Sequence, residues 1–291
     1  MSLLDEVRKL GYSTPPVFDE PVILAWKKTL VETMCELPKR PAWPGAPHGL
    51  SRHCAEELVN TLTGELEQIE ALLQERYGVP HLYNVKDPLA ELLLIMLSRK
   101  TPEDAYLRAF DRLLDGHDSW EEIHQMEEEE LLATVEDGGL ASKKAAAIKS
   151  MLDDVFELSG EYSLDGLHEK SDEEVFAFLS SLEEVGPKST LCVMMYALER
   201  PAFPVDAHVG RLMQRLGVFE TIGLELEPMD HKQKQKHLTN LVPPHLRYSL
   251  HVNALMLGRE LCPARKPQCE KCPLASCCKT GRAQVMQPAV S

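Results

Sequence analysis

The chain has 291 residues, of which 44% are hydrophobic and 26% are charged, and its formal net charge is -15 at pH 7. This composition is typical of a globular protein with one or two domains, and no apolar run approaches the ~20 residues of a membrane-spanning helix. The first residues, MSLLDEVRKL, lack the cationic start and apolar stretch of a secretory signal. We therefore expect an intracellular protein, in the cytoplasm, the nucleoid or the nucleus, with no membrane partner.

Charge is distributed unevenly along the chain. Residues 1–185 carry 17 Lys and Arg against 38 Asp and Glu, a net charge of -21, whereas residues 186–291 carry 14 against 8, a net of +6. An asymmetry of this size indicates a face that binds a polyanion. Acidic helices that only keep the first part of the chain in solution would give the same counts, so charge alone leaves both interpretations open.

Residues 1–48 hold seven prolines around one predicted helix at 20–37, and we interpret them as an N-terminal extension. From residue 51 onward, apolar residues recur three and four positions apart, as in amphipathic helices. Alternation of apolar and polar residues is nowhere long enough for a sheet, so the sequence predicts an all-α fold. Helix starts are marked by capping side chains and by proline at the first helical position: Asp87-Pro88, Thr101-Pro102, and Ser171 with Glu174.

Residues 178–198 are predicted to form a helix, a tight turn and a second helix. Gly186 gives the turn its backbone freedom, and Pro187 begins the second helix. The free N-H groups at such a helix N-terminus suit a phosphate group. Lys188 lies in the first turn, where the helix dipole opposes an ammonium ion and lowers its pKa, as an amine nucleophile requires. A lysine at this position is nevertheless more often a surface residue without a role.

A second candidate residue, Asp206, follows an extended segment at Pro204 and Val205. The sequence predicts that Asp206 caps a helix that carries Arg211 and Arg215 on one face. The cap alone would account for an aspartate here.

Five of the eight cysteines lie between Cys262 and Cys278. In a reducing compartment such a cluster favours metal ligands over disulfides. The cluster has one close pair, Cys269-x2-Cys272, whereas zinc sites usually have two, and its spacing is not that of ferredoxins. The residues themselves leave zinc and iron-sulfur binding open. The remaining cysteines are expected to be core thiols: Cys35, Cys54 and Cys192.

Three motifs in order, VGPKS at 185–189, FPVDAHVGR at 203–211 and the cysteine spacing x6, x2, x5, resemble the endonuclease III branch of the helix-hairpin-helix DNA glycosylases. The resemblance covers roughly residues 65 to 280, and the second motif is also similar to plant 5-methylcytosine DNA glycosylases. It implies two helical domains with the active site in the cleft between them. The domain boundaries that it implies are 86–203 for a helical barrel with the hairpin, and 49–85 with 204–291 for an iron-sulfur cluster domain.

The resemblance also implies a function, that of a bifunctional DNA glycosylase and AP lyase of base-excision repair. Such an enzyme acts as a monomer on double-stranded DNA with a modified base, here a pyrimidine, or an abasic site. By the resemblance, Lys188 attacks C1′ of the deoxyribose and holds it as a Schiff base, and β-elimination then nicks the strand. Asp206 stabilises the positive charge that develops on the sugar.

The cofactor that the resemblance implies is a 4Fe-4S cluster. Its ligands would be Cys262, Cys269, Cys272 and Cys278, with Cys277 as a bystander. The DNA-binding residues that it implies lie in the hairpin, after the first buried helix, after Asp206 and on the loop between the first two ligands: Val185, Gly186, Ser189, Lys100, His208, Arg265 and Lys266.

Two positions depart from the family pattern. Glu184 stands where the hairpin usually has a glycine, which adds a carboxylate beside the expected phosphate and a side chain where φ is expected to be positive. Lys100 stands where a glutamine commonly fills the gap left by the flipped base, so the preferred base is not predicted. Glu184 and the acidic first part of the chain leave a second function open, that of a DNA-binding protein without turnover. A redox sensor that uses the cluster is a further alternative.

Overall fold

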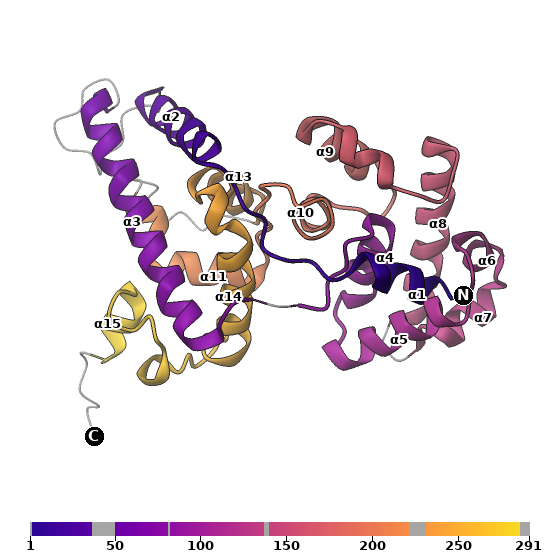
Figure 1. Cartoon of the computed structure of the whole chain (residues 1–291). Coiled ribbons are helices and arrows are strands. Elements are labelled where there is room, and N and C mark those ends of the chain that lie inside the picture. The colour runs from indigo at the N-terminus through magenta and orange to yellow at the C-terminus, as the bar shows by residue number, and fades with distance from the viewer. Residues whose placement is uncertain (1, 37–49, 81, 137–139, 222–230, 286–291) are drawn as a thin grey trace. The chain divides into compact units, whose positions relative to one another are not determined.

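The computed structural model describes residues 2–36, 50–80, 82–136, 140–221 and 231–285. In these ranges the chain is helical, and its one β-type contact is an isolated bridge between Tyr12 and Val85, so the all-α prediction is confirmed (Figure 1). None of the described helices combines the length and apolar character that crossing a bilayer requires. The chain divides into two compact units, Met1–Thr14 with Leu82–Arg200 and Pro15–His81 with Pro201–Ser291.

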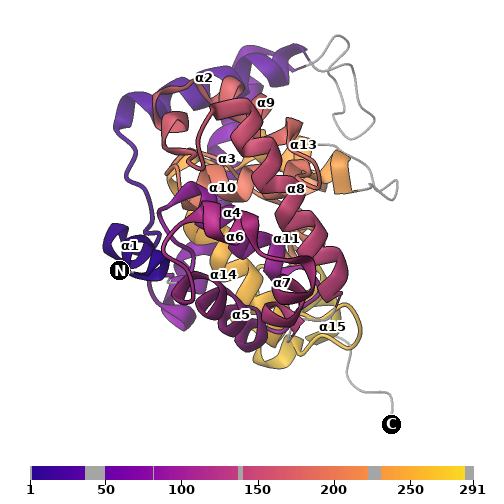
Figure 2. The same cartoon turned by 90° about the vertical axis from the view of Figure 1, so that its right-hand side faces the viewer.

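The first unit is built around α4 (Pro88–Ser98), in which every residue from Pro88 to Leu97 is buried. A helix that is apolar on all sides belongs in the middle of a bundle, and α4 packs against α5, α8 and α10. The N-terminal helix α1 also packs on α5 (Figures 1 and 2). The helices of this unit are α1 (Leu3–Leu10), α5 (Glu103–Asp115), α6 (Trp120–Gln125), α7 (Glu128–Thr134), α8 (Ala141–Ser159), η2 (Asp165–Glu169), α9 (Asp172–Ser181) and α10 (Pro187–Tyr196).

Two of the three predicted helix starts in this unit are confirmed. Asp87 caps α4 by accepting a 2.8 Å hydrogen bond from the Ala90 N-H, and Ser171 forms the expected capping box at α9. The third start is one residue later than predicted, because Pro102 is the N-cap of α5 and no side chain bonds there. The Thr101 hydroxyl instead donates to the Arg99 carbonyl, 3.0 Å away.

The second unit is centred on α3 (Arg52–Tyr77), α11 (Ala207–Leu216) and α14 (Arg247–Glu260). α14 packs on both α3 and α11, and α2 (Glu20–Glu36) packs on α3 (Figure 1). Leucines of these helices are fully enclosed, among them Leu66, Leu73, Leu250 and Leu257. The remaining elements are α12 (Val218–Thr221), α13 (His231–Leu241), η3 (Pro244–Leu246), η4 (Cys269–Lys271) and α15 (Lys279–Val285).

The N-terminal region does not form one extension. Residues 1–14 belong to the first unit through α1, and α2 belongs to the second, whereas the sequence predicted a single extension at 1–48. The physical reason is that α1 and α2 each have buried apolar residues that pack on a different unit. Residues 37–49 lie outside the described ranges.

The three cysteines outside the cluster are not equally buried. Cys192 is buried in α10 and Cys35 is half-buried, but Cys54 is exposed. The prediction of a core thiol is wrong for Cys54 because this residue lies in the first turn of α3, before the first buried residue of that helix, Ala55.

A buried acid joins α3 to α14. Glu70 is 3% exposed, and its Oε1 accepts a 3.3 Å hydrogen bond from the Asn253 side-chain amide. Burial raises the pKa of Glu70 to about 7, although hydrogen bonds from Ser249, Gln74 and Asn253 act in the opposite direction. Glu70 Oε2 and Asn253 Oδ1, both acceptors, are buried without a hydrogen bond in the described structure. A carboxylate at Glu70 adds a buried charge without a donor for Oε2, so this site favours the neutral acid.

We expect the substitution E70Q to stabilise the protein at pH 8 but not at pH 5. The pKa of Glu70 is about 7 in the folded protein against an ordinary 4.5, so the folded state holds more protons between these values. The contribution of this group is therefore complete below pH 4.5 and is lost as the pH rises through 7. Urea unfolding should show E70Q more stable by about 2 to 3 kcal/mol at pH 8. Identical pH dependence of the two proteins would contradict the assignment.

Candidate functional site

The hairpin predicted at 178–198 is formed by α9, a turn at residues 182–186, and α10. Pro187 occupies the first position of α10, and Gly186 is its N-cap without a side-chain hydrogen bond. The Val185 N-H donates to the Leu182 carbonyl, 3.2 Å away, and both side chains are buried, which anchors the turn. The first N-H groups of α10 are therefore not capped by a side chain, an arrangement that suits an anion.

Lys188 is the second residue of α10 and is exposed. Gly186 is also exposed, whereas Ser189 is buried with 7% of its surface accessible. Because the side chains of Val185 and Ser189 are both buried, these two residues could contact a ligand only through their backbone. The structure thus places the predicted nucleophile on the open side of the hairpin and turns two predicted DNA-binding side chains inward.

A buried carboxyl group of α4, Glu91, lies within electrostatic reach of Lys188. Burial raises the pKa of Glu91 to about 8, and hydrogen bonds from the Val85 N-H and the Asn84 amide and the charge of Lys188 lower it in part. The sequence analysis missed Glu91. Its signal was an acid inside the otherwise apolar run from Leu89 to Leu97.

Glu184 has φ 61, so the expectation of a positive φ at this position is confirmed. Its carboxylate lies 3.4 Å from Nη1 of Arg99, and Nη2 of the same arginine donates to the Glu184 carbonyl. The neighbouring Glu183 accepts a 2.7 Å hydrogen bond from the Ser150 hydroxyl and donates its N-H to Asp154, 2.6 Å away. Both glutamates of the turn are therefore bound by side chains of the first unit.

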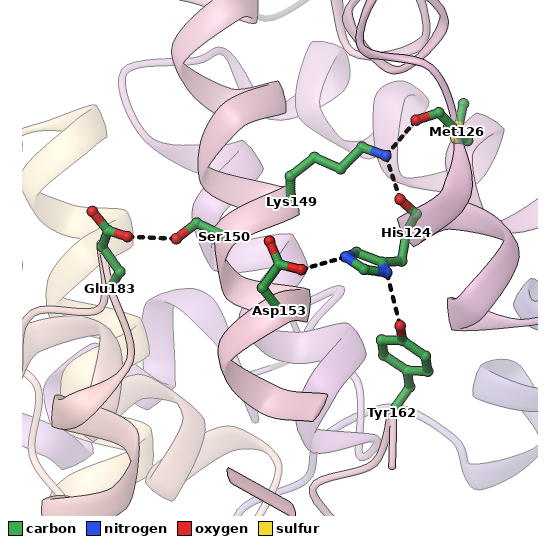
Figure 3. A network of polar contacts seen from close by, with 7 residues as sticks. All are labelled: His124, Met126, Lys149, Ser150, Asp153, Tyr162 and Glu183. Carbon is green, nitrogen blue, oxygen red and sulfur yellow. Dashed lines mark hydrogen bonds and ion pairs between the residues drawn. The ribbon is translucent and has the colours of Figure 1, made fainter. Parts of the chain in front are cut away.

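Helix α8, which provides Ser150 and Asp154, is itself held by a polar network (Figure 3). Asp153 accepts a 2.6 Å hydrogen bond from Nε2 of His124, and the Tyr162 hydroxyl donates to Nδ1, 2.7 Å away. Lys149 donates to the carbonyls of His124 and Met126. The contacts of Figure 3 thus run from the turn at Glu183 through α8 to α6.

Lys100 lies exposed on the turn after α4, with φ 53. The turn is held from inside by Lys144 of α8, which is 6% exposed and donates to the Leu97 carbonyl, 2.6 Å away, and to the Thr101 hydroxyl. Burial lowers the pKa of Lys144. The position of Lys100 is therefore set by contacts of its neighbours in the chain.

In the second unit, Asp206 caps α11 as predicted. Its Oδ1 accepts hydrogen bonds from the N-H groups of His208 and Val209, at 2.8 and 2.7 Å. The extended segment before it is held by Gln235 of α13, which accepts from the Val205 N-H and donates to the Phe203 carbonyl, both at 2.7 Å. Gln235 was not identified from the sequence, because its contact is with a segment 30 residues away.

His208 is half-buried and its Nδ1 lies 3.0 Å from Nη2 of Arg211, which donates to it. The ring packs on Gly258, where a Cβ would stand 2.6 Å from the Cβ of His208. Arg211 also donates to the carbonyls of Gly258 and Cys262, at 3.1 and 2.9 Å. The ring is thereby kept in place.

The second arginine of α11 holds the cysteine loop. Arg215 donates to the carbonyls of Pro263 and Ala264, at 2.8 and 2.9 Å, and its Nη1 lies 3.0 Å from the Cys262 sulfur. The far end of the loop is fixed by the Gln268 N-H, which donates to the Leu261 carbonyl, 2.8 Å away. Arg265 and Lys266 are exposed between these anchors, so their charge is presented on a loop bound at both ends.

The sulfur atoms of four cysteines influence one another. Burial raises the pKa of the Cys272 thiol to about 11, and the charges of Cys262, Cys278 and Cys269 also raise it. Burial and the charges of Cys278 and Cys262 likewise raise the pKa of Cys269. This donor set suits a metal that takes thiolates, because a bound cation would offset the mutual repulsion. Within the described ranges no three His, Cys, Asp or Glu side chains are grouped so that they could hold a single metal ion as they stand.

Cys277 has different surroundings from these four. Its Sγ lies 3.4 Å from the Leu274 carbonyl, and it lines a cavity with Glu65 and Arg282. Cys278 is buried, donates to the Arg215 carbonyl at 3.2 Å and accepts from the Gly281 N-H at 3.4 Å. These contacts favour Cys278 over Cys277 as the fourth member of the set.

Lys188 belongs to the first unit and Asp206 to the second.

Comparison with known proteins shows what the chain is similar to. Endonuclease III of Thermotoga maritima is 25% identical over 214 residues, which cover 74% of this chain and 92% of that protein. In solved structures, a non-covalent endonuclease III-DNA complex superposes with a TM-score of 0.63 and 23% identity, covering 77% of this chain and 99% of that chain. The chain therefore has the all-α fold of that structure, as the sequence predicted.

Two plant proteins are also similar to the chain. A candidate DNA glycosylase of Arabidopsis thaliana is 33% identical over 55% of this chain and 52% of its own length. The DNA glycosylase/AP lyase ROS1 of the same plant is 28% identical over 63% of this chain, but over 14% of its own length. The chain thus spans about half or less of these plant relatives. No family model matches the chain.

The capping role of Asp206 leads to a stability prediction. We expect D206A to lower the free energy of unfolding by about 1 kcal/mol, because the start of α11 loses its cap. The matched variant D206N retains a capping oxygen and should lose only a few tenths of a kcal/mol. Urea unfolding of the three proteins measures this, and equal losses in the two variants would contradict the capping role.

Proposed function

We propose that the protein is a bifunctional DNA glycosylase and AP lyase of base-excision repair that removes a modified pyrimidine from double-stranded DNA. The observation that carries the proposal is the hairpin: α10 begins without a side-chain cap, and Lys188 is exposed in its first turn. The similarity to endonuclease III and to the DNA glycosylase/AP lyase ROS1 supports it. Binding as a monomer to modified or abasic DNA belongs to the same proposal.

The chemistry follows from an amine placed beside a sugar. The modified base leaves the stack, which costs a few kcal/mol. The Lys188 amine then forms a bond to C1′ while the bond from C1′ to the base breaks and its electron pair leaves with the base. The lysine nitrogen loses its proton, and the sugar ring opens to a Schiff base. Loss of a proton from C2′ then breaks the C3′-O bond, which nicks the strand on the 3′ side.

Asp206 has the second role in this scheme. Positive charge develops on the sugar as the base leaves, and a carboxylate lowers the energy of that state. Its backbone hydrogen bonds to His208 and Val209 hold the carboxylate in one orientation, so little reorganisation is needed during the reaction. The same carboxylate would assist the loss of the lysine proton.

For the remaining contacts we propose DNA backbone binding. The N-H groups at Gly186 and Ser189 suit one phosphate, because the hairpin offers backbone rather than side chains there. The N-H of Val185 is bonded to the Leu182 carbonyl and is not available to a phosphate, so Val185 would act by fixing the shape of the turn. Exposed or half-buried side chains would bind other phosphates or fill the gap left by the base: Lys100, His208, Arg265 and Lys266.

We assign a 4Fe-4S cluster to Cys262, Cys269, Cys272 and Cys278. The charges of Cys262 and Cys278 act on both Cys269 and Cys272, whereas Cys277 interacts with Cys278 alone among the cysteines, and this pattern supports the choice. When bound, the cluster would supply a rigid cross-link of the loop, and no chemical step is assigned to it. Arg215 and the backbone of Gly281 hold the first and last of these cysteines.

We expect borohydride to trap a covalent complex between the protein and a duplex that carries a modified pyrimidine or an abasic site. K188A should trap no complex while it still binds the duplex, and D206N should slow base release by about 100-fold or more. An exposed lysine outside the hairpin provides the matched control K143A. Trapping by K188A at the level of the parent protein would exclude Lys188 as the nucleophile. Tight binding without nicking by the parent would instead indicate a DNA-binding protein without turnover.

The ligand assignment is tested by iron content. C278S should lose iron and visible absorbance in the purified protein, whereas C277S should retain both, because Cys278 and not Cys277 acts on the thiols of Cys269 and Cys272. Zinc in place of iron, or iron loss in C277S alone, would overturn the assignment. Each variant is measured as the full chain, purified without oxygen.

A further inference from the structure

One arginine binds both the side chain and the backbone of the residue that departs from the hairpin pattern. Arg99 follows α4 as its C-cap. Its Nη1 lies 3.4 Å from Oε2 of Glu184, and its Nη2 donates to the Glu184 carbonyl. The two contacts join residues 85 positions apart in the chain, both in the first unit.

The turn needs such a contact for two physical reasons. Glu184 has φ 61, a region that residues with a side chain adopt at a cost and glycine adopts freely. In addition, Glu183 and Glu184 place two carboxylates directly before α10, whose uncapped N-terminus suits a phosphate. A free carboxylate beside that position would repel the phosphate.

Each carboxylate is accounted for by a different partner. Glu183 is bound by Ser150, and its N-H is bound by Asp154. Neither contact brings a positive charge to the turn. The Arg99 guanidinium therefore has a role that the other contacts do not share, because it alone among these partners offsets negative charge.

We propose that Arg99 is a positioning residue of the hairpin, which holds Glu184 in its left-handed conformation and offsets the charge of its carboxylate so that the start of α10 can bind a phosphate of DNA. This inference rests on the proposed function. It also explains how a hairpin with glutamate in place of glycine retains the open helix N-terminus. The same arginine ties the turn that carries Lys100 to the hairpin, since Lys100 is the next residue.

A double-mutant cycle tests this role by DNA binding. The probe is a duplex with a tetrahydrofuran abasic analogue, and the readout is its dissociation constant by fluorescence anisotropy at low and moderate salt. R99M should weaken binding roughly 3- to 10-fold, because the Glu184 carboxylate loses its ion pair and its negative charge then repels the phosphate. E184G should bind at least as tightly as the parent protein. In the E184G background, R99M should change the affinity by less than about twofold.

The conservative variant R99K adds a geometric test. A lysine can pair with the carboxylate but lacks the planar fork that reaches a carboxylate and a carbonyl together, so R99K should restore binding only in part. E184Q separates charge from backbone conformation, because it removes the carboxylate and keeps a side chain at the left-handed position. Binding by E184Q at the level of E184G would assign the effect to charge.

A measurement without DNA keeps this inference separate from the proposed function. Amide exchange at Val185, whose N-H is bonded to the Leu182 carbonyl, should be about tenfold faster in R99M than in the parent, and E184G should reverse this. Circular dichroism and thermal unfolding show whether each variant is folded.

Two outcomes would overturn the role of Arg99, and a third would overturn the proposed function instead. Equal loss of affinity on R99M in both backgrounds would mean that Arg99 contacts DNA itself. If R99M had the DNA affinity and the Val185 amide exchange of the parent protein, the contacts of Arg99 with Glu184 would have no effect on the turn. A parent protein that does not bind the abasic duplex at all would overturn the proposed function and its phosphate site, while the exchange result would still report on the turn.

Discussion

Loop carbonyl groups in this protein are satisfied by charged side chains that extend from neighbouring helices. A carbonyl shielded from water without a hydrogen bond is costly, and loops cannot bond their own backbone as helices do. Arg215 binds the carbonyls at Pro263 and Ala264, Arg99 binds the one at Glu184, and Lys144 binds that of Leu97 in the last turn of α4, where helix carbonyls also lack a backbone partner. Each of these contacts positions a segment that the proposed function needs.

The candidate catalytic residues combine a structural and a chemical position. Asp206 is an N-cap whose hydrogen bonds also orient its carboxylate, and Lys188 is exposed because the buried side of α10 faces α4. The buried acid Glu91 senses the charge of Lys188 from within that interface. Helix ends thus supply both the geometry and the electrostatics of the chemistry that we propose.

The uneven charge of the chain also has a structural counterpart. The two glutamates of the hairpin turn lie in the acidic part of the sequence, yet each is bound by a neighbour, Glu183 by Ser150 and Glu184 by Arg99. The basic residues Arg265 and Lys266 remain exposed on their anchored loop. The net charge of a segment therefore says less about the groups that we propose for DNA binding than the pairing of each individual charge does.

Sequence by itself determined the helical class, the caps at Asp87, Ser171 and Asp206, and the hairpin, because caps and turns depend on neighbouring residues. It also identified Glu184 as a departure from the glycine that the hairpin usually has, at a position where φ is positive. Only the tertiary structure decided that Arg99 pairs with Glu184, that α1 and α2 pack on different units, and that Cys277 lines a cavity with Glu65 and Arg282. Such contacts join residues tens of positions apart, and their partners are chosen by packing, which no local pattern in the chain records.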